Sequence, residues 1–243
     1  MAELDGRCLV VTGASGNLGS AVCARLLRGG AKVMALVHRE SERLSLANAL
    51  IGETSSSARD RLEVRVAELS AEASVESAFD AAVLRFGGLW GAVSCAGGYA
   101  GGAVADTSLE TFEKMIALNL RSAFLVSRAA MRRLVPLGEG RIVCVASISA
   151  AALSGVGGSG AYAISKAGVI ALVRALAEEG AKTGVRSNCV APGTMRTPAN
   201  ARSMPGSDES RWVPPAEVAE AIAFLSAPGS ASVNGAVITL PGQ

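Results

Sequence analysis

"CLVVTGASGNLGS", residues 8–20, joins a short β-branched apolar run to a glycine-rich loop and then to a segment with helical character. The run predicts a strand over 8–13. A glycine-rich loop between a first strand and a first helix brings backbone N–H groups and a helix N-terminus onto a diphosphate. We expect Gly13 to allow the turn, Gly16 to allow the close approach of a diphosphate, and Gly19 to allow tight packing of helix on strand. The stretch favours a dinucleotide-binding unit over the alternative, a plain turn in a glycine-rich chain.

The same alternation of apolar runs and helical segments continues along the chain. Several runs are apolar at consecutive positions, as strands of a parallel sheet covered on both faces should be. Repeated βαβ units with right-handed crossovers build a doubly wound sheet. The sequence therefore predicts an α/β fold, a single Rossmann-type doubly wound parallel β-sheet of about seven strands with helices on both faces, forming one domain over 1–243. The expected strands are 8–13, 32–37, 62–67, 89–97, 141–147, 185–192 and 236–242, and the expected helices are 18–28, 41–51, 71–86, 108–134, 160–182 and 215–227.

Composition narrows the possible partners. Of 243 residues, 50% are hydrophobic and 18% charged, the net charge is +2, and basic runs interleaved with aromatics are absent, so we expect no nucleic-acid partner. A lone His38 and five scattered cysteines argue against a metal site and for reduced thiols. The N-terminal residues carry no apolar signal region, so a cytoplasmic protein without a membrane segment is expected. The uncharged stretch 142–165 is rich in Gly and Ser, and we interpret it as a buried strand running into a loop.

Two glycine-rich loops and one polar segment are candidates for a substrate site. The loops, 96–107 and 154–160, each follow a predicted strand, at the sheet edge where open α/β sheets bind ligands. The segment 198–215 is largely polar, carries Pro and Gly, and interrupts the α/β rhythm. We expect it to be a substrate lid.

The stretch "AYAISKAG", residues 161–168, sets one of two tyrosines four positions before one of four lysines. Residues i and i+4 of a helix lie on one face, so Tyr162 and Lys166 are expected to be neighbours. The alternative places Tyr162 at a core edge and Lys166 in solvent.

The end of the second predicted strand, "LVHRES", bears on cofactor preference. A protein that prefers NAD usually places Asp or Glu there against the ribose hydroxyls, but Val37 holds that position. His38 and Arg39 follow and are suited to a 2′-phosphate, so NADP(H) is favoured and NAD(H) stays possible. The alternative is that Arg39 starts the next helix in solvent beside Glu40 and Glu42.

The ordered motifs resemble those of the short-chain dehydrogenases/reductases over nearly the whole chain. They are "TGASGNLG", "CAGG" (95–98), "ALNLRSAF" (117–124), "RIVCVAS" (141–147), "YAISK" (162–166) and "NCVAPGTMRTP" (188–198). Two stretches, "CAGGYAGG" and "TPANARSMPGSDESRWVPPAEVAEAI", are similar to dihydropteridine reductase. That enzyme's pattern lacks the catalytic serine, so a dihydropteridine-reductase-like enzyme is the second interpretation, and a non-catalytic NAD(P)-binding sensor or scaffold is the third.

The resemblance implies an oxidoreductase that transfers hydride between a nicotinamide and a carbonyl or alcohol substrate, usually as a homo-oligomer, a tetramer or dimer, for which the apolar helices 108–134 and 160–182 offer an interface. It implies a catalytic set of Asn119, Ser147, Tyr162 and Lys166, with Ser149 as the alternative serine. It implies cofactor contacts from Gly13, Ser15, Gly16, Asn17, Leu18, Gly19, His38, Arg39, Glu68, Leu69, Cys95, Ala96, Gly97, Tyr162, Lys166, Pro192, Gly193 and Thr197.

Two positions depart from the pattern of the family. The loop is spaced T-G-x-x-G-x-x-G, the form of larger members, with Asn17 where a glycine is usual, and Cys95 replaces an Asn.

The chemistry of the implied set follows from its residue types. We expect the Lys166 ammonium to lower the pKa of Tyr162, making it a general acid/base. Ser147 is expected to polarise the substrate oxygen. Asn119 is expected to hold a water that links Lys166 to solvent. The alternative for Asn119 is a buried amide that satisfies backbone groups.

Overall fold

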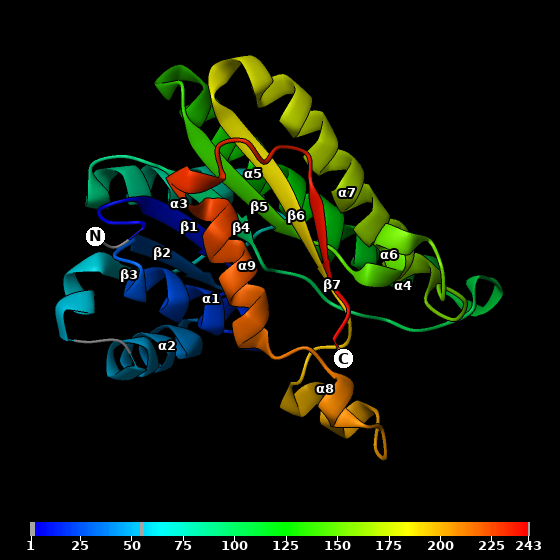
Figure 1. The fold of residues 1–243 in the computed structure, drawn as a ribbon. Helices are drawn as coiled ribbons and strands as arrows, with labels where there is room; N and C mark the ends of the chain where they lie inside the picture. The colour runs from blue at the N-terminus through cyan, green and yellow to red at the C-terminus, as the bar shows by residue number, and fades with distance from the viewer. Residues whose placement is uncertain (1–2, 54–55, 243) are drawn as a thin grey trace.

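The computed structural model describes residues 3–53 and 56–242. Its centre is one sheet of seven parallel strands in the order β3-β2-β1-β4-β5-β6-β7. This order starts a second winding direction after β1, which confirms the predicted doubly wound fold (Figure 1). The strands are β1 Cys8–Thr12, β2 Lys32–Val37, β3 Leu62–Val66, β4 Gly91–Ser94, β5 Gly140–Val145, β6 Val185–Pro192 and β7 Val237–Leu240.

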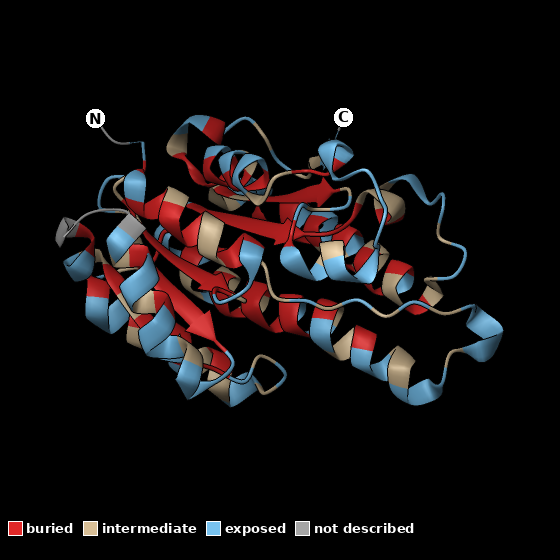
Figure 2. Cartoon of the chain, turned by 90° about the horizontal axis from the view of Figure 1, so that it is seen from below, coloured by how far each residue is buried: buried red, intermediate tan, exposed pale blue. Residues whose placement is uncertain are grey.

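Helices cover both faces of the sheet and bury alternate strand residues. On one face α1 (Asn17–Arg28), α2 (Glu40–Glu53) and α9 (Pro215–Ser226) share a core with Leu9 and Val11 of β1. On the other, α3 (Glu72–Phe86), α5 (Ser122–Leu134) and α7 (Gly160–Gly180) pack on Cys8 and Val10. The five inner strands are therefore almost wholly buried between two helical layers whose outer faces are exposed (Figure 2), whereas the edge strands β3 and β7 are partly exposed. This explains why β1 is apolar at consecutive positions rather than alternating.

The region 108–134, predicted as one helix, is helical without a break over 109–134. Ser108 caps α4 (Leu109–Met115), a π-helical segment runs over Ile116–Arg121, and α5 continues from Ser122. A correction concerns the loop 154–160, which follows a short helix, α6 (Ile148–Ala152), rather than a strand. The remaining helices are α8 (Pro198–Ser203) and the 3₁₀ segments Ser56–Arg61, Val104–Asp106, Val135–Leu137, Ala181–Thr183, Glu209–Arg211 and Pro228–Ser230.

The two glycine-rich loops contact each other at the carboxyl edge of the sheet. The N–H of Gly102 donates a hydrogen bond to the carbonyl of Gly158 (2.7 Å), and Gly102 forms a parallel bridge with Ser159. The loops thereby form one wall beside the N-terminus of α7.

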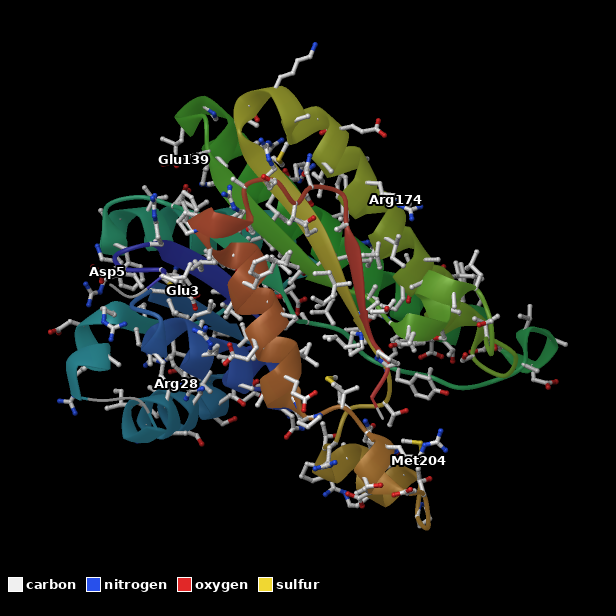
Figure 3. The ribbon with its side chains drawn as sticks, viewed as in Figure 1. Glu3, Asp5, Arg28, Glu139, Arg174 and Met204 are labelled. Carbon is white, nitrogen blue, oxygen red and sulfur yellow. The ribbon has the colours of Figure 1, made fainter. Side chains whose placement is uncertain are left out.

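The segment with α8 projects from the body of the molecule (Figure 1), and Met204 lies on this projecting part (Figure 3). Its two ends are tied together, because Met195 and Val213 form a bridge and the N–H of Arg196 donates to the carbonyl of Val213 (2.8 Å). The segment therefore has a fixed base and a projecting tip. Its use as a lid stays a prediction.

One helical stretch, Gly160–Thr183, is the single part of the described chain that is long and apolar enough to cross a membrane by length and composition. Half of that window is buried against the rest of the molecule, as in a core helix. The five cysteines are all free thiols, and all but Cys95 are buried.

Candidate active site

The loop between β1 and α1 holds the main chain in a shape that excludes side chains at two positions. Gly13 has φ of +62°, and a Cβ atom there would lie 2.8 Å from the Cα of Ala96. At Gly19 a Cβ atom would collide with the carbonyl oxygen of Gly13. These are the turn and the tight packing that the sequence predicts. Gly16 is the N-cap of α1 and makes no side-chain cap, so no capping side chain competes with an anion for the first-turn N–H groups.

A cleft of about 400 Å³ opens beside this loop, at the carboxyl ends of β2, β3 and β4. Eight of the predicted cofactor residues line it: Gly13, Ser15, His38, Arg39, Glu68, Leu69, Ala96 and Gly97. The other lining residues are Leu36, Val37, Glu42, Ala67, Ser70, Lys114, Ala117, Leu118 and Ser122. Loop and cleft together fit an extended nucleotide with a diphosphate.

Glu42, in the first turn of α2, places its carboxylate among the donors of this cleft. Its Oε2 accepts hydrogen bonds from the Ser15 hydroxyl (2.9 Å) and from the backbone N–H groups of His38 (3.2 Å) and Arg39 (3.4 Å). Its Oε1 accepts one from Arg39 Nε (3.0 Å). Desolvation works to raise the pKa of Glu42, but these bonds outweigh it and hold the pKa below its usual value. Glu42 is therefore an ionised carboxylate bound by four donors.

Glu68 follows β3 and lines the same cleft next to His38. Its Oε1 accepts hydrogen bonds from the Ser70 N–H (3.0 Å) and hydroxyl (2.8 Å), and these bonds lower the pKa of Glu68. The Nδ1 atom of His38 lies 3.8 Å from the other carboxylate oxygen. Both side chains are more than half exposed, so this part of the cleft is polar and open to water.

Asn119 lies in the π-helical segment and is 1% exposed. Its amide bonds both main-chain groups of Gly98, accepting from the N–H and donating to the carbonyl, each at 3.0 Å. It also donates to the Ser165 hydroxyl (3.0 Å). The side chain thus does what the alternative interpretation expected, and it fixes the loop after β4 to α7. The predicted water relay stays a prediction.

Lys166 is buried beneath the same loop. It is 6% exposed, and its Nζ donates to the carbonyl of Val145 (2.8 Å). A Cβ atom on Gly97 would lie 2.5 Å from Asn119 Oδ1 and 3.2 Å from Lys166 Nζ, so both groups converge on Gly97. Burial lowers the pKa of Lys166 to about 8, because it disfavours the ammonium form. The alternative that placed Lys166 in solvent is wrong.

Tyr162 lies one helical turn before Lys166 on α7, and its side chain is hydrogen-bonded to that of Ser147. Ser147 also accepts from the N–H of Ala150 (3.3 Å), which makes it the N-cap of α6, and its hydroxyl lies 3.1 Å from that of Ser149. The ring of Tyr99 meets the ring of Tyr162 edge to face, with centroids 5.0 Å apart. Both candidate serines therefore lie in one hydroxyl chain, and Ser147 is the member bonded to the tyrosine.

The pKa of Tyr162 differs from the sequence-based expectation. Burial raises it above its ordinary value, while the hydrogen bond from Ser147 lowers it and the Tyr99 phenol adds to the rise. Lys166 directs its Nζ to the Val145 carbonyl instead. The expectation of a lowered pKa is wrong for the protein alone, because desolvation of the phenolate outweighs the favourable contacts.

The remaining predicted cofactor residues are not among the described residues that line the cleft. Asn17 and Leu18 begin α1, and Pro192 ends β6. The N–H of Gly193 donates to Leu240 (2.8 Å), and the Thr197 hydroxyl caps α8. Cys95 is only partly exposed, and desolvation of its thiol raises the pKa to about 12, so the thiol stays protonated. The cofactor contacts expected of these residues stay predictions.

Two residues of the site, Glu42 and Lys114, escaped the sequence analysis, and Tyr99 was included only as part of the loop 96–107. Glu42 was considered only as a solvent-exposed neighbour of Arg39, although the spacing of three on a helix is a signal for their ion pair. Lys114 reaches the cleft from α4, and Tyr99 contacts Tyr162 from the glycine-rich loop. Nothing in the local sequence singles out these two positions.

Residues 7–207 match the family model of the short chain dehydrogenases. The chain belongs to this family. Levodione reductase of Leifsonia aquatica is 32% identical over 254 residues, covering 97% of this chain and 93% of that protein. 2-(R)-hydroxypropyl-CoM dehydrogenase of Xanthobacter autotrophicus is also 32% identical, with 97% of each chain covered.

Solved structures of short-chain dehydrogenases agree with this assignment. A crystal structure of levodione reductase superposes with a TM-score of 0.89 at 26% identity, covering 98% of this chain and 97% of that one. A variant of actinorhodin polyketide ketoreductase, solved with NADPH, superposes with a TM-score of 0.88 at 28% identity, covering 97% and 96%. The chain is accordingly an NAD(P)-dependent oxidoreductase that transfers hydride between a nicotinamide and a small-molecule carbonyl or alcohol substrate. The dihydropteridine-reductase-like and non-catalytic alternatives are not favoured.

Proposed function

We propose that this short-chain dehydrogenase is an NADP(H)-dependent carbonyl reductase or alcohol dehydrogenase with Tyr162 as its general acid/base. The observation that carries the proposal is the grouping of Tyr162, Ser147 and Lys166 within one helical turn of α7 and the end of β5. Asn119 and Lys166 both reach Gly97, which lines the cleft. The proton donor therefore lies close to the expected cofactor site.

In the direction of reduction, Tyr162 donates its phenolic proton to the substrate oxygen. Because burial raises the pKa of Tyr162, the hydroxyl keeps its proton near neutral pH and is ready to act as an acid. Ser147, already bonded to Tyr162, donates a hydrogen bond to the same oxygen and polarises the carbonyl. The bound nicotinamide supplies the hydride.

Lys166 and Asn119 support this step from beneath the loop after β4. With a pKa of about 8, Lys166 exchanges protons near neutral pH and is suited to return a proton to Tyr162 after each turnover. We propose that Lys166 also binds the hydroxyls of the ribose that carries the nicotinamide. Asn119 holds Gly98 and Ser165 in place. We propose that the π-helical segment around Asn119 binds the water that connects Lys166 to solvent.

For the adenosine half we propose a preference for NADP(H), with NAD(H) possible. Arg39 lines the cleft next to the Ser15 hydroxyl and the backbone N–H of His38, a set of donors that suits a 2′-phosphate. Val37, at the end of β2, offers no carboxylate to the ribose. The structural relative solved with NADPH is consistent with this assignment.

The remaining predictions join the proposal. The segment 198–215 is proposed as the substrate lid, because its bridged base allows the projecting tip to move as a unit. We propose a cytoplasmic homo-oligomer, a tetramer or dimer. Exposed apolar side chains on α5 and α7, including Phe124 and Ile164, support association through these helices.

The experiment that tests the proposal pairs nucleotide binding with turnover. Calorimetric titration with NADPH and NADH is expected to show tighter NADPH binding that Arg39→Glu weakens. On a panel of carbonyl substrates, Tyr162→Phe is expected to lower kcat at least about 100-fold, in the range of general acid–base catalysis. Cofactor affinity should change much less, because the ring stays in place. Tyr99→Phe, the chain's other tyrosine, is the control and should stay within about threefold.

The outcomes separate the parts of the proposal. Equal binding of both nucleotides would contradict the NADP(H) preference. Nucleotide binding with no turnover on any substrate would favour a sensor. Full activity of Tyr162→Phe would remove Tyr162 from the mechanism.

A further inference from the structure

The carboxylate of Glu42 lies where the cleft offers its best anion-binding donors. A hydroxyl, a guanidinium N–H and two backbone N–H groups converge on it, at 2.9–3.4 Å. The Glu42 side chain is 20% exposed, whereas that of Glu40, two residues before it, is 68% exposed. Glu42 is thus turned into the cleft and Glu40 toward solvent.

The same donors are those that a 2′-phosphate requires. Phosphates in proteins are bound by arginine, by hydroxyls and by backbone N–H groups at the start of a helix. Arg39, Ser15 and the first N–H groups of the β2–α2 junction are such a set, and Glu42 accepts a hydrogen bond from each of them. A 2′-phosphate placed among the same donors would lie beside the Glu42 carboxylate, and the two negative charges would repel each other.

An unphosphorylated ribose makes the opposite demand. Its 2′- and 3′-hydroxyls donate hydrogen bonds, and a carboxylate at the end of the second strand is the acceptor that serves them in NAD-binding proteins. Glu42 offers such an acceptor from the first turn of α2, although Val37 occupies the usual position. The chain therefore carries an acceptor for NAD(H) and donors for NADP(H) at one point of the cleft.

We propose that Glu42 is a specificity-determining residue, an internal anion that must leave Arg39 and Ser15 before a 2′-phosphate can bind. The inference rests on the proposed function of the cleft as the cofactor site. Glu42 favours the unphosphorylated ribose and thereby narrows the preference for NADP(H) that Arg39 creates. It sits on an exposed helix turn, so its side chain has solvent to move into.

The other charged residues around the cleft are not placed to favour the unphosphorylated ribose over a 2′-phosphate, as Glu42 is. Glu68 is held by Ser70 and lies near His38. Lys114 lines the cleft from α4 and favours any phosphate, whatever residue 42 is. Glu40 forms an ion pair with Arg43 through the same i,i+3 spacing, Nε to Oε1 at 2.6 Å, but outside the cleft lining.

The Glu40–Arg43 pair therefore provides a matched control, Glu40→Gln, for Glu42→Gln. Calorimetry with adenosine 2′,5′-bisphosphate and 5′-AMP measures how much the 2′-phosphate contributes to affinity, because the two probes differ only in that group. The measurement requires no turnover. NADPH and NADH are titrated in parallel on the full chain. Glu42→Gln is expected to tighten the bisphosphate and NADPH about tenfold and to weaken 5′-AMP and NADH about threefold, because it removes a negative charge from the phosphate position. Glu40→Gln should change neither ratio.

A second variant, Glu42→Ala, guards against an effect peculiar to the amide, and thermal unfolding reports whether each variant is folded. An unchanged ratio of bisphosphate to 5′-AMP affinity in both variants would overturn the inference while leaving the proposed function intact. Weaker binding of both probes would overturn it too, since Glu42 would then be a structural support. Failure of every probe and both dinucleotides to bind the unmodified protein would overturn the inference together with the cofactor site.

Discussion

Two groups of residues flank the cleft, and they are built in different ways. The buried cluster (Asn119, Ser165 and Lys166) lies beneath the loop that carries Gly97 and Gly98. It is fixed mainly by hydrogen bonds to main-chain atoms, and its three side chains are at most 6% exposed. The edge cluster (Ser15, His38, Arg39, Glu42 and Glu68) is held by contacts of side chains with one another and with nearby backbone N–H groups, and most of these side chains are exposed. Both line or adjoin one cleft.

This difference in burial indicates that the buried cluster acts on turnover and stability, whereas the edge cluster acts on nucleotide affinity. Buried polar groups with complete hydrogen bonding hold one arrangement, and a lost partner is costly. Exposed ion pairs contribute little to stability and rearrange easily. We therefore expect substitutions in the buried cluster to affect turnover or stability strongly, and substitutions in the edge cluster to tune which nucleotide binds.

Gly97→Ala should have the largest effect in this comparison. The added Cβ would lie 2.5 Å from Asn119 Oδ1 and 3.2 Å from Lys166 Nζ, so one of these groups must move. We expect kcat to fall about 100-fold, as for small displacements of catalytic groups. Gly98→Ala is the control, because its Cβ would meet only the ends of two flexible side chains, Leu118 at 3.1 Å and Met115 at 3.9 Å. Equal steady-state rates for the two variants would contradict the comparison.

Asn119→Ala should lower the free energy of unfolding by about 2 kcal/mol, because it removes hydrogen bonds to Gly98 and Ser165. Urea unfolding measures the change. Asn200→Ala, which removes a bond to the Met195 carbonyl in the projecting segment, is expected to cost about 0.5 kcal/mol. A loss below that of Asn200→Ala would show that the buried cluster does not depend on Asn119.

Lys166 should make the stability of the protein rise with pH. Its folded pKa of about 8 lies below the unfolded value of 10.5, so between these values the unfolded state binds more protons. Relative to Lys166→Met, the unmodified protein should gain about 1.4 kcal/mol between pH 7 and pH 9. Denaturant titrations at both pH values test this, with the exposed Lys182→Met as the control. If the free energy of unfolding changed equally between pH 7 and pH 9 in the unmodified protein and in Lys166→Met, Lys166 would be hydrated in the native state.

His38→Ala should have the smallest effect. Its 3.8 Å contact with Glu68 joins two exposed side chains, so the free energy of unfolding should change by less than about 0.5 kcal/mol. Urea unfolding checks this value. A loss above about 1 kcal/mol would show that the edge cluster is a structural element and would weaken the contrast between the two clusters.

The sheet and the catalytic helix could be predicted because their signals are local. Apolar β-branched runs and glycine spacing locate β1 and the turn at Gly13, and the offset of four places Tyr162 and Lys166 on one face of α7. These patterns depend on residues near one another in the sequence. The predicted order of strands and helices followed from them.

The parts that could not be predicted depend on distant contacts. The π-helical turn at 116–121 contains no helix-breaking residue, and Asn119 is held by Gly98 from another segment. Glu42 becomes an anion within the cleft only because Ser15 and the β2–α2 junction fold around it. The raised pKa of Tyr162 arises from burial by the assembled core, which local sequence does not report.

The bridge between Gly102 and Ser159 has a consequence for how new specificities arise in this scaffold. One loop follows β4 and the other precedes α7, yet they share a hydrogen bond and a strand-like pairing, and Gly102 has φ of +146°. A length change in either loop therefore shifts the register of both. Grafting a relative's substrate preference would require transplanting the two loops as a pair, and recombination between them would yield mismatched halves.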